Sequence, residues 1–395
     1  PPALRVDLVA DGAWPRIFLL GLPKTGTTAL TGRLKTLKQV CLREAENPGR
    51  DKEAHFFDTH YVEEIIGAGH PEKAGAQSYR SRYTDPVCHR SNYAYMDATP
   101  SYATVLDVPK AIHAVYPAAL RPSLRFLVIL REPVSRLFSI YHHVRCRILV
   151  HWPISAKKCA PLVRSGSSAG EPGSPFRRWP SPDPPTHSAS NCDTFEADLR
   201  VRVRLGNTTR VVPSEQARAC GINVRGHLIR NWTFAQFADA AVGECTGLSG
   251  ENLFEVLRSF VSGFGPSQLL AVTTDLLWDL ATLPSVLRAI VDFMGFRALT
   301  PGEKPVDDSD VPPAWFERPL ANTNSEGSAC QMAKLPPPGK LEESLDCAQA
   351  FRLHGVLQHT MDSVFKLVGG PHRPTMQPRL PPFQPVTARL NCSSL

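Results

Sequence analysis

The sequence predicts an α/β fold, a single domain with a central parallel sheet flanked by helices, a flexible insertion and a C-terminal lobe. Two apolar runs, residues 16–22 and 124–130, have the length of buried strands and end at turn signals. Helical spacing follows each run, over residues 29–40 and 134–149. Strands that alternate with helices in this way are typical of a parallel sheet.

The remaining elements continue the alternation. Further strands are predicted over residues 93–97 and 267–274. Further helices are predicted over residues 108–116, 226–242, 252–260, 275–294 (interrupted at Pro284) and 342–367, and residues 300–340 read as loop. Residues 151–192 are rich in Ser, Pro and Gly and predict the flexible surface insertion. We therefore divide the domain into residues 1–150, 151–192, 193–299 and 300–395.

Composition narrows the class of protein. The 395 residues are 42% hydrophobic and 21% charged, which is typical of a globular chain. The net charge of +7 suits an anionic ligand, and the absence of a basic stripe interleaved with aromatics argues against nucleic acid. No apolar run reaches 18 residues, so no transmembrane helix is visible. The chain begins at Pro1, and we expect any membrane attachment to come through an N-terminal anchor outside it.

The ten cysteines contain no C-x-x-C pair, so the sequence predicts no metal site. Their number fits an oxidising compartment, and the sequons at Asn207, Asn231 and Asn391 add weak support for a secreted glycoprotein. Cys330 and Cys347 flank a proline-rich loop, and we expect them to form a disulfide.

The first candidate site is the segment FLLGLPKTGTTAL, residues 18–30. Nucleotide triphosphatases place a lysine after the last glycine of their phosphate loop, whereas here Lys24 precedes Gly26. Successive backbone N–H groups at a helix start form an anion site that the helix dipole reinforces. Lys24 adds a charge, and hydroxyl groups come from Thr25, Thr27 and Thr28. The alternative is an ordinary strand-to-helix turn with a threonine cap, which needs fewer donors.

The second candidate is LREPVSRLFSIYHH, residues 130–143. Arg131 lies just past a predicted strand, where open α/β sheets bind ligands. Ser139 follows eight residues later, about two helical turns on, so both side chains could bind a second phosphate. For this pair in isolation, a surface arginine and a solvated serine are the simpler interpretation.

The third candidate is KEAHFFD, residues 52–58, in which Glu53, His55 and Asp58 surround two phenylalanines. We expect the aromatic rings to shield a carboxylate and raise its pKa, which would suit it to act as a base. In isolation, an amphipathic segment with its phenylalanines in the core is the simpler interpretation.

Together, the three segments resemble the sulfotransferases that use 3′-phosphoadenosine-5′-phosphosulfate (PAPS). LPKTGTT resembles their 5′-phosphosulfate loop, which is P-loop-like, and LREPVSRLFSIY resembles their 3′-phosphate segment. EAHFFD, DATPSY and residues 267–296 are similar to the Golgi branch that modifies heparan sulfate, the 3-O- and N-sulfotransferases. The resemblance covers most of the chain, in separate segments. The first two motifs together are specific for this family.

The resemblance implies a role for each matching residue. Residues 1–150 would form the PAPS-binding core, with Lys24 at the bridging oxygen of the phosphosulfate and Arg131 and Ser139 at the 3′-phosphate. Glu53 matches the catalytic base, while His55 and Asp58 match acceptor-side positions, with His55 the next candidate for the base. The implied reaction transfers a sulfuryl group to a hydroxyl or amine and releases 3′,5′-ADP, without a metal, in the Golgi lumen or secretory pathway. A cytoplasmic location is the alternative.

Two departures leave the acceptor open between a carbohydrate and a small metabolite. Ala98 precedes Thr99-Pro100-Ser101-Tyr102 where the heparan branch usually has lysine. The late basic loop that closes over PAPS in that branch lacks its arginine here, and Lys334 or Lys340 could substitute for it. Two other functions remain alternatives, a P-loop nucleotide kinase and a non-catalytic nucleotide- or glycan-binding descendant. The position of Lys24 argues against the first, and the retention of Lys24 and Glu53 against the second.

Overall fold

The computed structural model describes the parts of the chain that carry the predicted core. The described residues are 14–43, 52–58, 71–84, 88, 93–143, 202–205, 208–211, 233–235, 237–238, 252–299, 310–317, 320, 345–369 and 392. The chain divides into two compact units. The first unit is Pro1–Arg131, Asn252–Thr323 and Met361–Phe383, and the second is Glu132–Glu251, Asn324–Thr360 and Gln384–Leu395. The predicted insertion, residues 151–192, lies outside the described residues.

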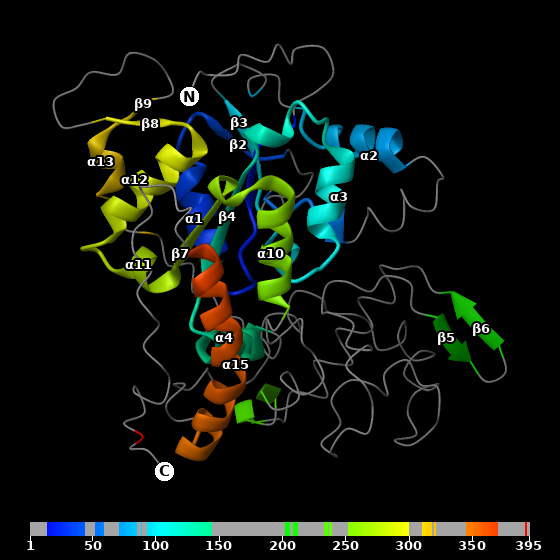
Figure 1. Ribbon diagram of the computed structural model, residues 1–395, viewed down its shortest axis with the longest axis vertical. Helices are drawn as coiled ribbons and strands as arrows, with labels where there is room; N and C mark the ends of the chain where they lie inside the picture. Colours follow the sequence, from blue (N-terminus) through cyan, green and yellow to red (C-terminus); the bar gives the residue numbers. More distant parts are fainter. Residues whose placement is uncertain are drawn as a thin grey trace, which may run out of the picture. The chain divides into compact units, whose positions relative to one another are not determined.

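The first unit is built on a five-stranded parallel sheet with the order β2-β3-β1-β4-β7. Figure 1 labels all of these strands except β1. Its strands are β1 (Ile17–Leu19), β2 (Val40–Cys41), β3 (Ala94–Asp97), β4 (Arg125–Leu130) and β7 (Leu269–Thr273). The predicted parallel α/β fold is therefore confirmed. The chain moves from β1 toward β2 and β3 on one side, and then crosses β1 to form β4 and β7 on the other. The carboxyl edge of β1 is thus a topological switch point, where open α/β sheets bind ligands.

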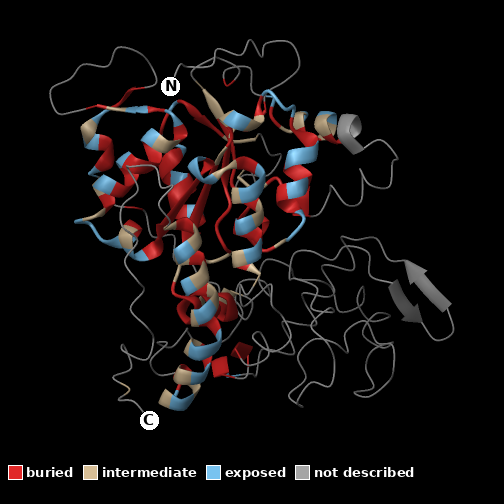
Figure 2. Cartoon of the chain, viewed as in Figure 1, coloured by how far each residue is buried: buried red, intermediate tan, exposed pale blue. Residues whose placement is uncertain are grey.

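Helices cover both faces of this sheet, and Figure 2 shows the strands as buried. Along β4, Phe126 and Val128 belong to one core cluster with α3 and α10, while Leu127 and Ile129 belong to another with α1 and α12. A strand buried on both faces needs apolar side chains at every position, which explains the continuous run that predicted it. The helices of the first unit are α1 (Thr27–Leu34), α2 (Pro71–Arg80), α3 (Val108–Val115), α10 (Leu253–Phe264), α11 (Thr274–Trp278), α12 (Leu283–Met294) and α13 (Pro313–Phe316).

Short elements complete the described chain. They are the 3₁₀ turns Pro100–Ala103, Arg121–Ser123 and Pro266–Gln268, and the strand pair β8 (Arg297–Ala298) and β9 (Asp310–Val311). The second unit contains α4 (Pro133–His142) and the hairpin β5 (Arg202–Leu205) and β6 (Thr208–Val211). Helix α15 (Cys347–Val368) begins in the second unit and ends in the first. No helix in the described ranges has the length and apolar character needed to cross a membrane.

Two local differences from the prediction have physical causes. Helix α1 ends at Leu34 because β2 follows at Val40, so the apolar residues between 35 and 40 belong to a turn and a strand. The break predicted at Pro284 comes earlier, since a proline fits the first turn of α12. Helices α2 and α13 were not predicted. The helix predicted over residues 226–242 lies largely outside the described residues.

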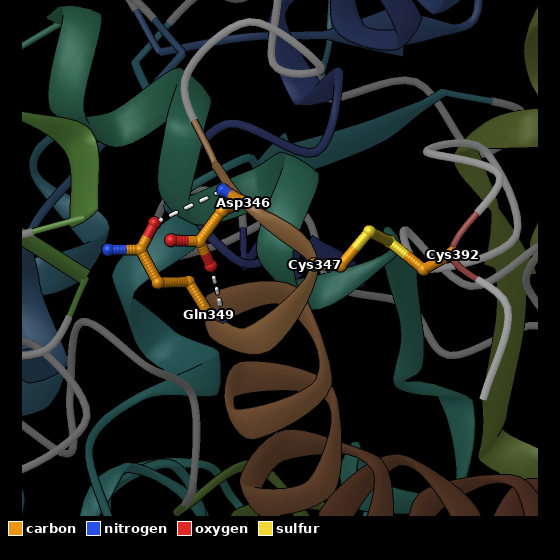
Figure 3. The surroundings of a disulfide bond; sticks show 4 residues. All are labelled: Asp346, Cys347, Gln349 and Cys392. Atoms are coloured by element: carbon orange, nitrogen blue, oxygen red, sulfur yellow. Dashed lines mark hydrogen bonds between the residues drawn. A yellow bond between two sulfur atoms is a disulfide. The ribbon is translucent and has the colours of Figure 1, made fainter. Parts of the chain in front are cut away.

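The expected Cys330–Cys347 disulfide is wrong, because Cys347 pairs with Cys392 (Figure 3). Cys347 opens α15, where Asp346 and Gln349 form a reciprocal cap. Gln349 N donates to Asp346 Oδ1 at 2.7 Å, and Asp346 N donates to Gln349 Oε1 at 3.2 Å. This cap fixes the helix start, and the Cα atoms of the two cysteines lie 5.6 Å apart. A second disulfide joins Cys41 at the end of β2 to Cys88.

Candidate active site

The loop between β1 and α1 follows the carboxyl edge of the central strand. Gly26 caps α1 with φ 99°, a left-handed conformation that favours glycine. Gly21 is required for a different reason, because a Cβ there would lie 2.2 Å from Cγ2 of Thr27. The two glycines let the loop turn tightly onto the first N–H groups of α1, as an anion site requires.

The predicted loop donors differ in accessibility. Lys24 and Gly26 are half-buried and Thr28 is exposed, so these three reach the surface of the loop. Thr25 and Thr27 are buried. The hydroxyl of Thr25 donates to Leu22 O at 2.8 Å, so it closes the turn. The structure therefore separates residues that can meet a ligand from residues that shape the loop.

Backbone strain coincides with the predicted site. Lys24 (φ 71°) and His55 (φ 48°) are the non-glycine residues with positive φ in the described part of the chain. Such conformations are costly for residues with a Cβ and persist where the surroundings enforce them, often at functional sites.

Two contacts, one from the residue that follows β4 and one from α11, hold the strained loop. Arg131 Nη1 donates to Lys24 O at 2.8 Å. The hydroxyl of Thr274 donates to Thr25 O and Leu130 O, each at 3.0 Å. Arg131 is thus brought to the loop, as its place after a strand predicted. Ser139 lies half-buried on α4 in the second unit, and its pairing with Arg131 stays a prediction.

The acidic segment 52–58 runs beside the residues that follow β3, where Ala98 N donates to Lys52 O at 2.8 Å. The imidazole of His55 lies between two carboxylates. Its Nε2 is 3.0 Å from Glu53 Oε2, and its Nδ1 is 2.9 Å from Asp58 Oδ2. The structure therefore brings together the three residues predicted for the third candidate. Within the described residues, no group of three or more metal-ligating side chains could hold an ion.

The expected rise in the pKa of Glu53 is wrong. Burial raises this pKa, but the hydrogen bond from His55 and the positive charges of Lys52 and His55 outweigh it and lower the pKa to about 2. The phenylalanines do not shield the carboxylate, because they point into the core. Glu53 is consequently a carboxylate held by cations and is ionised at neutral pH.

This depressed pKa predicts a pH-dependent contribution to stability. The contribution is present above pH 4.5, the ordinary value for Glu, and is lost as the pH falls toward about 2. In Glu53→Gln, the loss of unfolding free energy relative to the wild type should be at most about 3 kcal/mol at neutral pH and should vanish at low pH. Denaturant unfolding between pH 7 and pH 2 measures this difference, with the exposed Glu255→Gln as the control. A difference that stays constant over this range would contradict the assignment.

Sequence reasoning missed three residues of the site. Lys52 contacts Glu53 Oε1 and supplies a cation to the acidic segment. Thr274 holds the loop, and the exposed indole of Trp278 lies beside Gly26, 3.7 Å from where a Cβ would be. Thr274 ends the strand predicted over residues 267–274 and Trp278 follows four residues later, and this place at the end of a strand was the available signal.

Comparisons with known proteins find sulfotransferases. Residues 15–149, which span the loop, the acidic segment and β4, match the sulfotransferase family. A human relative, heparan sulfate glucosamine 3-O-sulfotransferase 6, is 28% identical over 128 residues, which is 32% of this chain and 30% of the relative. The resemblance to a sulfotransferase family close to the heparan sulfate 3-O-sulfotransferases is therefore confirmed.

Two solved structures were also matched at low similarity. A sulfotransferase from Alicyclobacillus acidocaldarius is 13% identical with a TM-score of 0.39, and the match covers 92% of this chain and 97% of that one. A sulfotransferase domain from the curacin biosynthetic pathway is 13% identical with a TM-score of 0.33, over 88% and 99% of the two chains.

Proposed function

We propose that this protein transfers a sulfuryl group from PAPS to a hydroxyl or amine of an acceptor and releases 3′,5′-ADP. The arrangement around β1 is the main support. The strained Lys24 loop lies at the end of the central strand, with Arg131, the residue after β4, against it. The acidic segment lies along the residues after β3, on the opposite side of β1. A donor bound toward β4 and an acceptor bound toward β3 would thus meet above one loop.

In the proposed reaction, an acceptor oxygen or nitrogen attacks the sulfur atom while the bond from sulfur to the bridging phosphate oxygen breaks in line. Negative charge develops on the departing oxygen, where Lys24 and the N–H groups of α1 stabilise it. Glu53 takes the proton that the acceptor loses. Its pKa of about 2 keeps it ionised and able to accept a proton, but makes it a weaker base than the raised pKa expected from the sequence would have made it. His55 and Lys52 hold the Glu53 carboxylate in place, and Asp58 holds the other side of the imidazole ring.

The acceptor and the setting are part of the proposal. A carbohydrate acceptor is supported by the human relative, whose name gives heparan sulfate glucosamine as its substrate. The two disulfides among the described residues fit the oxidising conditions of the secretory pathway. A panel of carbohydrate and small-molecule acceptors incubated with ³⁵S-labelled PAPS tests the function directly. Transfer to no acceptor, together with tighter binding of ATP–Mg²⁺ than of 3′,5′-ADP, would refute it.

Nucleotide affinity should depend on the 3′-phosphate through Arg131. In Arg131→Ala, we expect affinity for 3′,5′-ADP to fall by about 10- to 100-fold, because a charge-assisted bidentate contact is lost. Affinity for 5′-AMP should fall far less. Calorimetry with both nucleotides measures the difference, and Arg258→Ala removes an exposed arginine of the same unit as the control.

An equal loss for both nucleotides would contradict the 3′-phosphate assignment. It would indicate that Arg131 acts only by holding the carbonyl of Lys24.

A further inference from the structure

The acidic segment is held by its backbone. Four consecutive N–H groups, those of residues 54–57, donate to two hydroxyl oxygens, and Ala54 N also lies 3.4 Å from Asp97 Oδ1. Thr99 Oγ1 accepts from Ala54 N at 2.9 Å and from His55 N at 3.3 Å. Tyr102 OH accepts from Phe56 N at 3.1 Å and from Phe57 N at 3.4 Å. The segment that carries Glu53 and His55 is therefore fixed to the turn that follows β3.

Both hydroxyls direct their protons to one buried carboxylate. Thr99 Oγ1 donates to Asp97 Oδ1 at 2.6 Å, and Tyr102 OH donates to Asp97 Oδ2 at 3.0 Å. Tyr79 OH also donates to Oδ2, at 2.8 Å. Asp97 is fully buried at the end of β3, next to the central strand. Its position links the sheet to the acidic segment without exposure to solvent.

The carboxylate determines which way the hydroxyls point. A hydroxyl has one proton and two lone pairs. When its proton goes to Asp97, only lone pairs remain for the backbone N–H groups. An acceptor-only group at Asp97 therefore converts both hydroxyls into acceptors for residues 54–57. This constraint also opposes relaxation of His55, whose φ of 48° is costly.

We infer that Asp97 is a positioning residue that sets the location of Glu53 and His55 through Thr99 and Tyr102. The expected effect of Asp97 on kcat rests on the proposed function, whereas its effect on the position of residues 54–57 does not. Asp97 lies at the end of β3 rather than in the acidic segment. The residues of the Lys24 loop, between β1 and α1, make none of these hydrogen bonds. Its effect should therefore fall on transfer and not on nucleotide binding.

Asp97→Asn and Tyr79→Phe form a matched pair for the test. Asparagine keeps the shape but places an N–H₂ group where one oxygen accepted, so one hydroxyl must turn its proton toward the backbone. Tyr79→Phe removes one hydrogen bond to Asp97 and leaves Thr99 and Tyr102 pointing as before. Tyr102→Phe removes only the hydroxyl that holds Phe56 N and Phe57 N, and it serves if Asp97→Asn does not fold.

In Asp97→Asn and Tyr102→Phe, kcat should fall by about 10²-fold while the KM for PAPS and the Kd for 3′,5′-ADP stay unchanged. Amide hydrogen exchange over residues 54–57 should accelerate in both variants and remain at the wild-type rate in Tyr79→Phe. Equal exchange in Asp97→Asn and Tyr79→Phe, or an equal loss of kcat in the two, would overturn the inference. If the wild type transfers sulfate to no acceptor, the proposed function fails, and hydrogen exchange alone still decides the role of Asp97.

Discussion

Replacing Glu53 by Gln is expected to lower turnover by about 10²–10⁴-fold and to leave affinity for 3′,5′-ADP nearly unchanged. Glutamine preserves the size of the side chain and can still accept a hydrogen bond from Lys52, but it cannot take a proton from the acceptor. The acidic segment lies on the β3 side of the loop, so the nucleotide site on the β4 side should be undisturbed.

The measurement is sulfate transfer from labelled PAPS to the best acceptor, with calorimetry of nucleotide binding on the same proteins. Glu255→Gln, an exposed carboxylate on α10, is the matched control. A variant that keeps more than about a tenth of the wild-type rate would show that Glu53 is not the base. His55 would then be the next candidate, although its ring, a cation between Glu53 and Asp58, would have to lose a proton before it could act as a base.

Lys24→Ala should fail in a different way, with both nucleotide affinity and turnover reduced. Lys24 is proposed to meet the donor before and during transfer, and the loss of one preorganised donor at a developing charge typically costs about 10²–10³ in kcat. Alanine, unlike glycine, retains the Cβ that makes a φ of 71° costly, so the strain at this position stays the same and only the cation is removed.

The same transfer assay and calorimetry apply, and Lys38→Ala provides the control, since Lys38 is an exposed lysine beyond the end of α1. Wild-type affinity for PAPS in Lys24→Ala would contradict the assignment of the loop. A loss of turnover alone would restrict Lys24 to the transition state.

The parts of the fold that depend on local pattern were predictable. Strands β1, β4 and β7 are buried on both faces, so their residues form continuous apolar runs, with the polar residues Arg125 and Thr273 only at the strand ends. Strand β2 was missed because its two residues follow an apolar helix and show no period of their own. The partner of Cys347 was predicted wrongly because proximity along the chain does not determine which cysteines meet.

The site was predictable where the type of a residue indicates its chemical role. It was less predictable where that role depends on contacts with other residues. Lys24 and Arg131 were found from charge placed after strands, and the structure joins them through one hydrogen bond. The direction of the Glu53 pKa could not be found, because it depends on where Lys52 and His55 point. The positioning role inferred for Asp97 joins residues more than 40 positions apart in the sequence, and the sequence around Asp97 shows only the end of a strand.

The Cys41–Cys88 disulfide closes a ring of chain that contains one half of the proposed site and not the other. The acidic segment, residues 52–58, lies inside the ring of chain that this bond closes, whereas Lys24 and Arg131 lie outside it. In the chain-entropy model a ring of this size stabilises the fold by about 4 kcal/mol. The host in which the protein is produced should therefore affect the stability of the acceptor side more than that of the donor loop. A reducing cytosol withholds a bond that encloses the acceptor side, while the donor loop contains no cysteine to lose.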